Sequence, residues 1–195
     1  MTTQTLDATR TAEIVRRVKA GDADAFGQIV KAYERRVFAL AATIVRADGA
    51  EDVAQDAFVR AFERLELYDV RRPFYPWLAT ITVRLAQNWL ARQSPGALRE
   101  VSIPPESSAH RSVAALPLDA LVAQDEGRRL WRLVARLPLG ERTALVLHYR
   151  QELSVNEVAA ALGVTTGTVK TLLFRARRHL RAALAEAPPD TRSAG

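Results

Sequence analysis

A row of hydroxyl and cationic side chains near the C-terminus has the types and the spacing needed to bind nucleic-acid phosphates. Between Val158 and Ala185 the sequence has five Lys or Arg residues and no acid. On a helix that begins near Thr165, short hydroxyl residues lie at the N-terminal end, where free amides and the helix dipole favour anions. The cations that follow would neutralise phosphates and release counterions. The predicted DNA-binding residues are Thr165, Thr166, Thr168, Lys170, Thr171, Arg175, Arg177 and Arg178.

A helix-turn-helix motif at about residues 154–175 would position this row. Ser154 and Glu157 have the spacing of a capping box, and Gly163 suits a helix end that needs a left-handed residue. Thr165 can then cap the second helix. That helix turns a set of apolar residues toward a core: Val169, Leu172, Leu173, Ala176 and Leu180. Because a lone cationic face could also be an ordinary solvated surface, the prediction of DNA binding depends on the whole pattern.

An acidic stripe in the N-terminal half suggests a different partner. From Asp48 to Asp69 the sequence has seven acids and two arginines. If Val53, Phe58 and Phe62 turn inward, helical spacing places one set of residues on the outer face: Asp52, Gln55, Asp56 and Val59. An acidic surface with a small apolar centre suits a basic protein surface and repels DNA. The alternative is an ordinary solvated helix face.

The segment at residues 71–92, RRPFYPWLATITVRLAQNWLAR, is similar to the segment with which extracytoplasmic-function sigma factors open and read the downstream promoter element, and this resemblance implies contact with an unpaired DNA strand. Phe74 and Tyr75, near its start, could stack on exposed bases. Polar groups that could bond base edges follow along one helical face: Thr80, Arg84, Gln87, Asn88 and Arg92. The neighbouring stripe is assigned to the core: Trp77, Ile81, Leu85 and Trp89.

Helical signals dominate the chain, and no stretch alternates like a strand. We expect Thr11, Asp22 and Asp119 to cap helices, and Asp48 with Glu51 to form a further capping box. The helices expected before the helix-turn-helix cover residues 11–21, 22–46, 48–67, 74–92, 119–137 and 138 onward.

Residues 94–118 are rich in proline and serine and have no sustained period, which predicts a linker. The expected fold is therefore all-α, with two small helical domains at residues 10–93 and 119–186 joined by a flexible linker.

Composition excludes several classes of function. The net charge of +6 favours a polyanionic partner, and the lack of cysteine excludes disulfides and thiolate metal sites. No apolar run has the length of a membrane span or of a signal core, so we expect a cytoplasmic protein without membrane insertion. The three histidines, His110, His148 and His179, are scattered, and no carboxylate pair stands out. We therefore expect no enzyme activity, cofactor, metal or small-molecule substrate.

Two parts of the chain resemble extracytoplasmic-function sigma factors of bacterial RNA polymerase. The segment from LPLGERTALVLHYRQELSVNEVAAALGV to TTGTVKTLLFRARRHLRAAL is similar to the family's promoter-reading region four. GAEDVAQDAFVRAFERL resembles the region-two helix that binds polymerase, and residues 71–92 are similar to the segment that opens and reads the downstream promoter element. The likeness extends over about residues 14–92 and 118–184.

The sequence departs from the family pattern at several positions. Leu172 stands where the family usually has arginine, and Glu152 where it often has glycine. Val83 and Arg84 replace a common Arg-Asn pair, and Asn88 replaces an aspartate. Specificity for the downstream element therefore cannot be transferred residue by residue.

The resemblance implies a sigma factor that binds the polymerase core at the β′ clamp and β flap. It would recognise the upstream and downstream promoter elements and assist strand opening, and an anti-sigma protein could hold it inactive. The alternative is a stand-alone helix-turn-helix regulator. Such a regulator would carry a receiver, ligand-binding or metal-sensing domain, and no pattern in the sequence indicates one.

Overall fold

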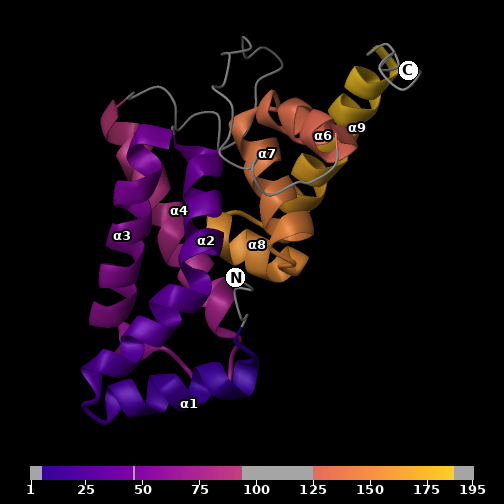
Figure 1. Cartoon of the computed structure of the whole chain (residues 1–195). Helices are drawn as coiled ribbons and strands as arrows, with labels where there is room; N and C mark the ends of the chain where they lie inside the picture. Colours follow the sequence, from indigo (N-terminus) through magenta and orange to yellow (C-terminus); the bar gives the residue numbers. More distant parts are fainter. Residues whose placement is uncertain (1–5, 46, 94–124, 187–195) are drawn as a thin grey trace.

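The computed structural model describes residues 6–45, 47–93 and 125–186, and within these ranges the chain folds into helices without strands (Figure 1). The expected all-α fold is confirmed. The predicted linker and the expected cap at Asp119 lie outside the described residues. No helix in the described ranges has the length and apolar character needed to cross a membrane.

We call the described residues up to 93 the front domain and those from 125 the rear domain. The front domain consists of α1 (Ala8–Lys19), η1 (Ala23–Ala25), α2 (Phe26–Ile44), α3 (Ala47–Glu63), η2 (Leu65–Leu67) and α4 (Phe74–Gln93). The rear domain consists of α6 (Asp125–Ala135), α7 (Leu139–Leu145), the π-helical turn η4 (Val146–Arg150), α8 (Val155–Leu162) and α9 (Thr166–Glu186).

Helix α1 begins earlier than the sequence suggested. Asp7 caps it by accepting a hydrogen bond from the Arg10 amide at 2.7 Å, so the expected cap at Thr11 is wrong. The Thr11 hydroxyl instead donates to the Asp7 carbonyl at 2.9 Å and lies 3.2 Å from the Tyr33 hydroxyl in the core. Asp22 does act as a cap, but of the short turn η1 that leads into α2.

In the front domain, α2, α3 and α4 pack together while α1 crosses one end of them (Figure 1). Their fully buried side chains include Ile14, Ile29, Leu40 and Leu78. Each such side chain contributes roughly 1.5–3 kcal/mol relative to an exposed one. Phe62, which we expected to point inward, is 44% exposed, although its ring makes an edge contact with Phe26 at 5.2 Å.

Gly49 lets α3 approach α4 closely. A Cβ atom at Gly49 would lie 2.4 Å from the Trp89 ring, a separation that real atoms do not adopt. We expect Gly49→Ala to lower the free energy of unfolding by about 1–3 kcal/mol through overpacking, despite the better helix propensity of alanine. Urea unfolding measures the effect.

The matched control is Gly27→Ala in α2, where a Cβ atom would meet nothing within 4 Å. It should be neutral or stabilising. Adding Trp89→Phe should return part of the stability lost in Gly49→Ala, because the smaller ring leaves room for the methyl group. Equal effects of the two glycine substitutions would contradict the packing explanation.

The two domains also pack against each other. Helix α8 lies against α4, and α7 and η4 lie against α2 (Figure 1). The buried side chains of both domains form one continuous cluster, and a small neighbouring cluster joins Ala39 of α2 to Ala135 and Trp131 of α6. The helices of the two domains are therefore held in one arrangement.

Candidate nucleic-acid interface

The helix-turn-helix forms as the sequence predicts. The Glu157 amide donates to the Ser154 hydroxyl oxygen at 3.3 Å, and the Ser154 amide donates to the Glu157 carboxylate at 2.8 Å, which closes the capping box. Gly163 ends α8 with a φ of 70°, in the left-handed region where glycine is favoured. Thr165 then accepts a hydrogen bond from the Thr168 amide at 3.2 Å and caps α9. The turn is thus fixed by local contacts.

The polar face of α9 has most of the predicted DNA-binding residues at its surface. The exposed members are Thr165, Thr166, Lys170, Thr171, Arg177 and Arg178, and the half-buried ones are Thr168 and Arg175. Arg177 is tied down, because it donates to the Leu173 carbonyl at 3.1 Å and to the Tyr149 hydroxyl at 3.3 Å. The face offers hydroxyls at its beginning and cations beyond them, as phosphate binding requires.

Two apolar residues of α9, Leu172 and Phe174, differ sharply in their exposure to solvent. Leu172 is 4% exposed and packs in the rear-domain core, so it does not face solvent. Phe174, which the sequence analysis missed, is 61% exposed. Its spacing of four residues from both Lys170 and Arg178 was the available signal, because it places the ring in the middle of the polar face. An exposed aromatic ring there could contact a thymine methyl group in the major groove.

Helix α9 is held in place from the side opposite its polar face. Val169, Leu173 and Ala176 are buried in the rear-domain core, as expected. In addition, Nδ1 of His179 lies 2.7 Å from a carboxylate oxygen of Glu141, a residue of α7 that is 2% exposed. This contact satisfies a buried carboxylate and fixes α9 relative to α7.

Glu152, which stands where the family often has glycine, has a left-handed backbone conformation. Its φ is 59°, the left-handed conformation that glycine adopts without strain, and glycine is common at this position in the family. The turn between η4 and α8 therefore keeps its shape even with a glutamate in place.

The acidic stripe on α3 is present on the surface. Asp52, Gln55, Asp56 and Val59 are all exposed, and Val59 is 54% exposed. Phe62, three residues after Val59 on α3, is a further exposed apolar side chain at 44%, and Leu67 in η2 is 81% exposed. The arrangement matches a protein-docking surface with acidic and apolar parts.

The polar face of α4 is partly open. Arg84, Asn88 and Arg92 are exposed, and Thr80 and Gln87 are half-buried. The Thr80 hydroxyl donates to the Pro76 carbonyl at 2.9 Å, so it already has an intrahelical partner. The cations and amides of this face remain available to a DNA strand.

The structure corrects the expectation that Phe74 and Tyr75 are open to bases. They are 4% and 5% exposed. The Phe74 ring lies 5.1 Å from that of Tyr68 and 5.4 Å from that of Trp77, and the Tyr75 ring stacks on that of Tyr33 at 5.7 Å. Both aromatic residues belong to the core in this arrangement, because the first turn of α4 points into the bundle.

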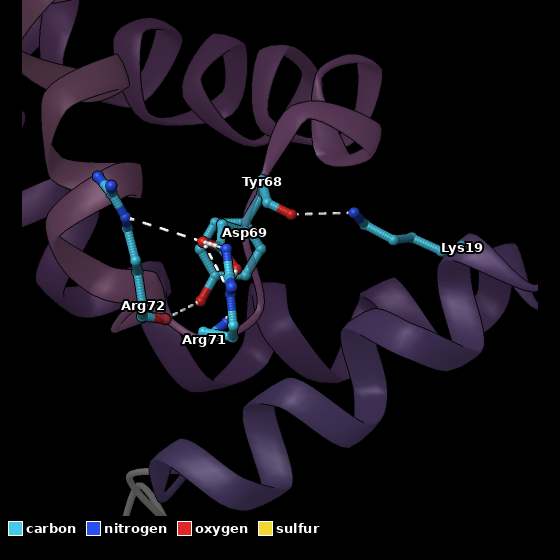
Figure 2. Close-up of polar contacts among 5 residues, drawn as sticks. All are labelled: Lys19, Tyr68, Asp69, Arg71 and Arg72. Carbon is cyan, nitrogen blue, oxygen red and sulfur yellow. Dashed lines mark hydrogen bonds and ion pairs between the residues drawn. The ribbon is translucent and has the colours of Figure 1, made fainter.

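The loop before α4 is fixed by polar contacts that Figure 2 shows. Nζ of Lys19 donates to the Tyr68 carbonyl at 2.9 Å, and the Tyr68 hydroxyl donates to the Arg72 carbonyl. Asp69 accepts from the Arg71 guanidinium at 2.9 Å and lies 3.9 Å from that of Arg72. Hydrogen bonds from Arg71 lower the pKa of Asp69 to about 2, while burial raises the pKa of Tyr68 to about 12.

Arg71 and Arg72 are highly exposed, with 86% and 82% of their side chains accessible. They lie in the loop just before the start of α4. Their exposure makes both arginines candidate phosphate contacts in addition to the residues predicted on α4.

The sequence of the chain matches two family models. One, described as Sigma-70 region 2, covers residues 29–95, and the other, described as Sigma-70, region 4, covers residues 127–180. The ECF RNA polymerase sigma factor SigW of Bacillus subtilis is 32% identical over 173 residues, which cover 86% of this chain and 92% of that protein. The ECF RNA polymerase sigma-E factor of Escherichia coli is 31% identical over 186 residues, covering 86% of this chain and 90% of that protein.

Two solved structures share the fold. One is CnrH in complex with the cytosolic domain of CnrY, with a TM-score of 0.62 and 24% identity over 93% of this chain and 100% of that chain. The other is the sigma factor RpoE from Bartonella quintana in complex with the anti-sigma factor NepR, with a TM-score of 0.62 and 21% identity over 84% of this chain and 98% of that chain. The matched regions and the curated relatives together show that the chain belongs to the extracytoplasmic-function group of the sigma-70 family.

Proposed function

We infer that this protein is a dissociable sigma factor that brings the RNA polymerase core to promoters and directs transcription initiation. The single observation that carries this inference is the separation of two surfaces of opposite charge. The acidic and apolar face of α3 belongs to the front domain, whereas the cationic face of α9 belongs to the rear domain. A protein that joins a basic protein surface to DNA needs this division.

On the polymerase side, the β′ clamp is the expected partner of the α3 face, and the β flap is the expected partner of the rear domain. Asp52 and Asp56 provide charge at an exposed position, and Val59 provides an apolar contact between charged neighbours. Charge complementarity of this kind accelerates association and excludes wrong partners.

On the DNA side, α9 reads the upstream promoter element in the major groove. Its hydroxyls and cations position the helix on phosphates, and Phe174 adds an apolar contact to base edges. Helix α4 reads the downstream element through its exposed side chains Arg84, Asn88 and Arg92, with Arg71 and Arg72 on nearby phosphates. Assistance in strand opening is part of the same role.

An anti-sigma protein is a proposed partner, since both related complexes of known structure hold one chain of this fold with a second protein. In this role the protein acts in the cytoplasm and has no catalytic chemistry of its own.

Transcription in vitro tests the proposed function. Polymerase core from the same organism, mixed with the chain and with genomic fragments, should initiate at a discrete set of start sites that the core alone does not use. A core that ignores every genomic promoter in the presence of the chain would refute the proposal. Nanomolar, site-specific binding to duplex DNA without polymerase would favour the alternative, a stand-alone regulator.

A further inference from the structure

Gln151 is a rear-domain residue whose side-chain and main-chain oxygens both accept hydrogen bonds from the front domain. It follows η4 and is 3% exposed. Its side-chain oxygen accepts hydrogen bonds from the Tyr75 hydroxyl at 2.8 Å and from Nε of Arg36 at 3.2 Å. Its main-chain oxygen accepts a third, from Nη2 of Arg36, at 3.1 Å. One amide residue therefore joins α2 and α4 to the rear domain.

Tyr75 is enclosed by this contact. The Arg36 guanidinium lies 3.6 Å from the centre of the Tyr75 ring, and the Tyr33 ring stacks on it. A guanidinium over an aromatic ring is more strongly attracted when water is excluded. Burial raises the pKa of Tyr75, which is consistent with a phenol that has lost its contact with water. A hydroxyl in such a site needs a partner, and Gln151 provides it.

Arg142 of α7 joins the two domains at a second point. It is 7% exposed, and its Nε donates to the Thr43 carbonyl at 2.9 Å while its Nη1 donates to the Ala135 carbonyl at 2.9 Å. Thr43 lies in the last turn of α2, where carbonyl groups lack intrahelical partners and carry partial negative charge. A guanidinium is well suited to that position.

In the closed arrangement, an element of the rear domain that is proposed to contact DNA lies against one of the front domain. Helix α8, which in a helix-turn-helix crosses the DNA backbone, lies against α4. Helix α4 is the helix proposed to read the downstream element, and Tyr75 at its start is inaccessible. DNA contact through the side of α8 that faces α4, or through Tyr75, therefore requires the domains to separate at this interface.

We propose that Gln151 is an intramolecular latch, which holds the free chain in a closed resting form by binding Arg36 and Tyr75, and that the latch opens when the chain is loaded on polymerase. The proposal rests on the proposed function for its second half only. The closed form itself is a property of the isolated chain. Opening frees the Tyr75 hydroxyl from Gln151, while the contacts of its ring with Tyr33 and Arg36 stay within the front domain.

Spin-label distances test the closed form. Because the sequence has no cysteine, Gln28→Cys in α2 and Arg132→Cys in α6 place two labels at exposed positions without background. The labelled chain should give one narrow distance distribution. Gln151→Ala should add a longer and broader population, with a shift of the closed-to-open ratio by about tenfold.

Two further variants make the result specific. Arg36→Met removes the hydrogen bonds to Gln151 from the front-domain side and should open the interface in the same way. Asn156→Ala, an amide deletion at an exposed position of α8, should leave the distance distribution unchanged. Circular dichroism verifies that each variant is folded. A broad distribution in the parent chain, or a narrow one in both folded interface variants, would overturn the latch.

Association with polymerase core tests the second half. Gln151→Ala should bind core faster than the parent chain, by up to about tenfold, because a larger fraction is already open. A variant that opens but binds polymerase core at the parental rate would show that the closed form does not slow this association. If neither protein binds polymerase at all, the proposed function fails, while the distance measurement still decides whether the latch exists.

Discussion

Replacing Lys170 and Arg175 by alanine is expected to weaken binding of the assembled holoenzyme to its promoters by on the order of ten- to hundredfold at moderate salt. Both side chains lie on the polar face of α9, where Lys170 is exposed and Arg175 half-buried. Each lost phosphate contact should also lower the slope of log affinity against log salt by about one, so the double variant should lose about two.

The measurement is binding of holoenzyme to a promoter fragment, repeated over a range of salt concentrations. The matched control is Arg132→Ala with Arg136→Ala, which removes the same charge from exposed positions on or next to α6. The control should change affinity little through long-range charge alone. An unchanged salt slope in the α9 variant would show that this helix faces away from DNA.

Reversing the charge of the α3 face should have a comparable effect on the other partner. Asp52→Arg with Asp56→Arg turns two exposed acids into cations in the centre of the predicted docking surface. Like charges brought together at a protein interface cost several kcal/mol, so affinity for polymerase core should fall on the order of a hundredfold or more. The fold should remain intact, because neither side chain is buried.

Titration against fluorescently labelled polymerase core measures this effect. The control variant Asp24→Arg with Glu34→Arg makes the same change in net charge at exposed front-domain positions outside α3. It separates a specific interface from a general change of the field around the protein. Equal affinities of the α3 variant and the parent chain would exclude α3 as the polymerase-binding surface.

Local signals in the sequence were sufficient for the turn and caps of the helix-turn-helix. The capping box at Ser154, the left-handed Gly163 and the cap at Thr165 all form as predicted, because each depends on residues within a few positions of one another. The outer position of Asp52 and Val59 follows from helical periodicity in the same way.

Long-range packing decided what the sequence did not predict. Phe74 and Tyr75 lie beside a loop, which suggested exposure, but they are buried by Tyr68 of that loop and by Tyr33 and Gln151, which are distant in sequence. A period of 3.6 residues identifies an apolar face and does not identify what will cover it.

The contact between the domains left no periodic signal either. Besides the shared apolar cluster, it includes two polar side chains, Gln151 and Arg142, that meet main-chain and side-chain groups across the interface. Glutamine and arginine are common on solvent-exposed helices, so their residue types alone gave no reason to expect burial. The cap of α1 was misplaced for a simpler reason, since Asp7 and Thr11 are both acceptable capping residues.

Glu141 and Arg142 are neighbours in α7 that hold different parts of the molecule. Glu141 contacts His179 of α9, and Arg142 contacts the end of α2. When the front domain departs, only the second attachment is broken. The rear domain therefore moves as one rigid body in which α9 is already oriented, and it needs no refolding before it binds a promoter.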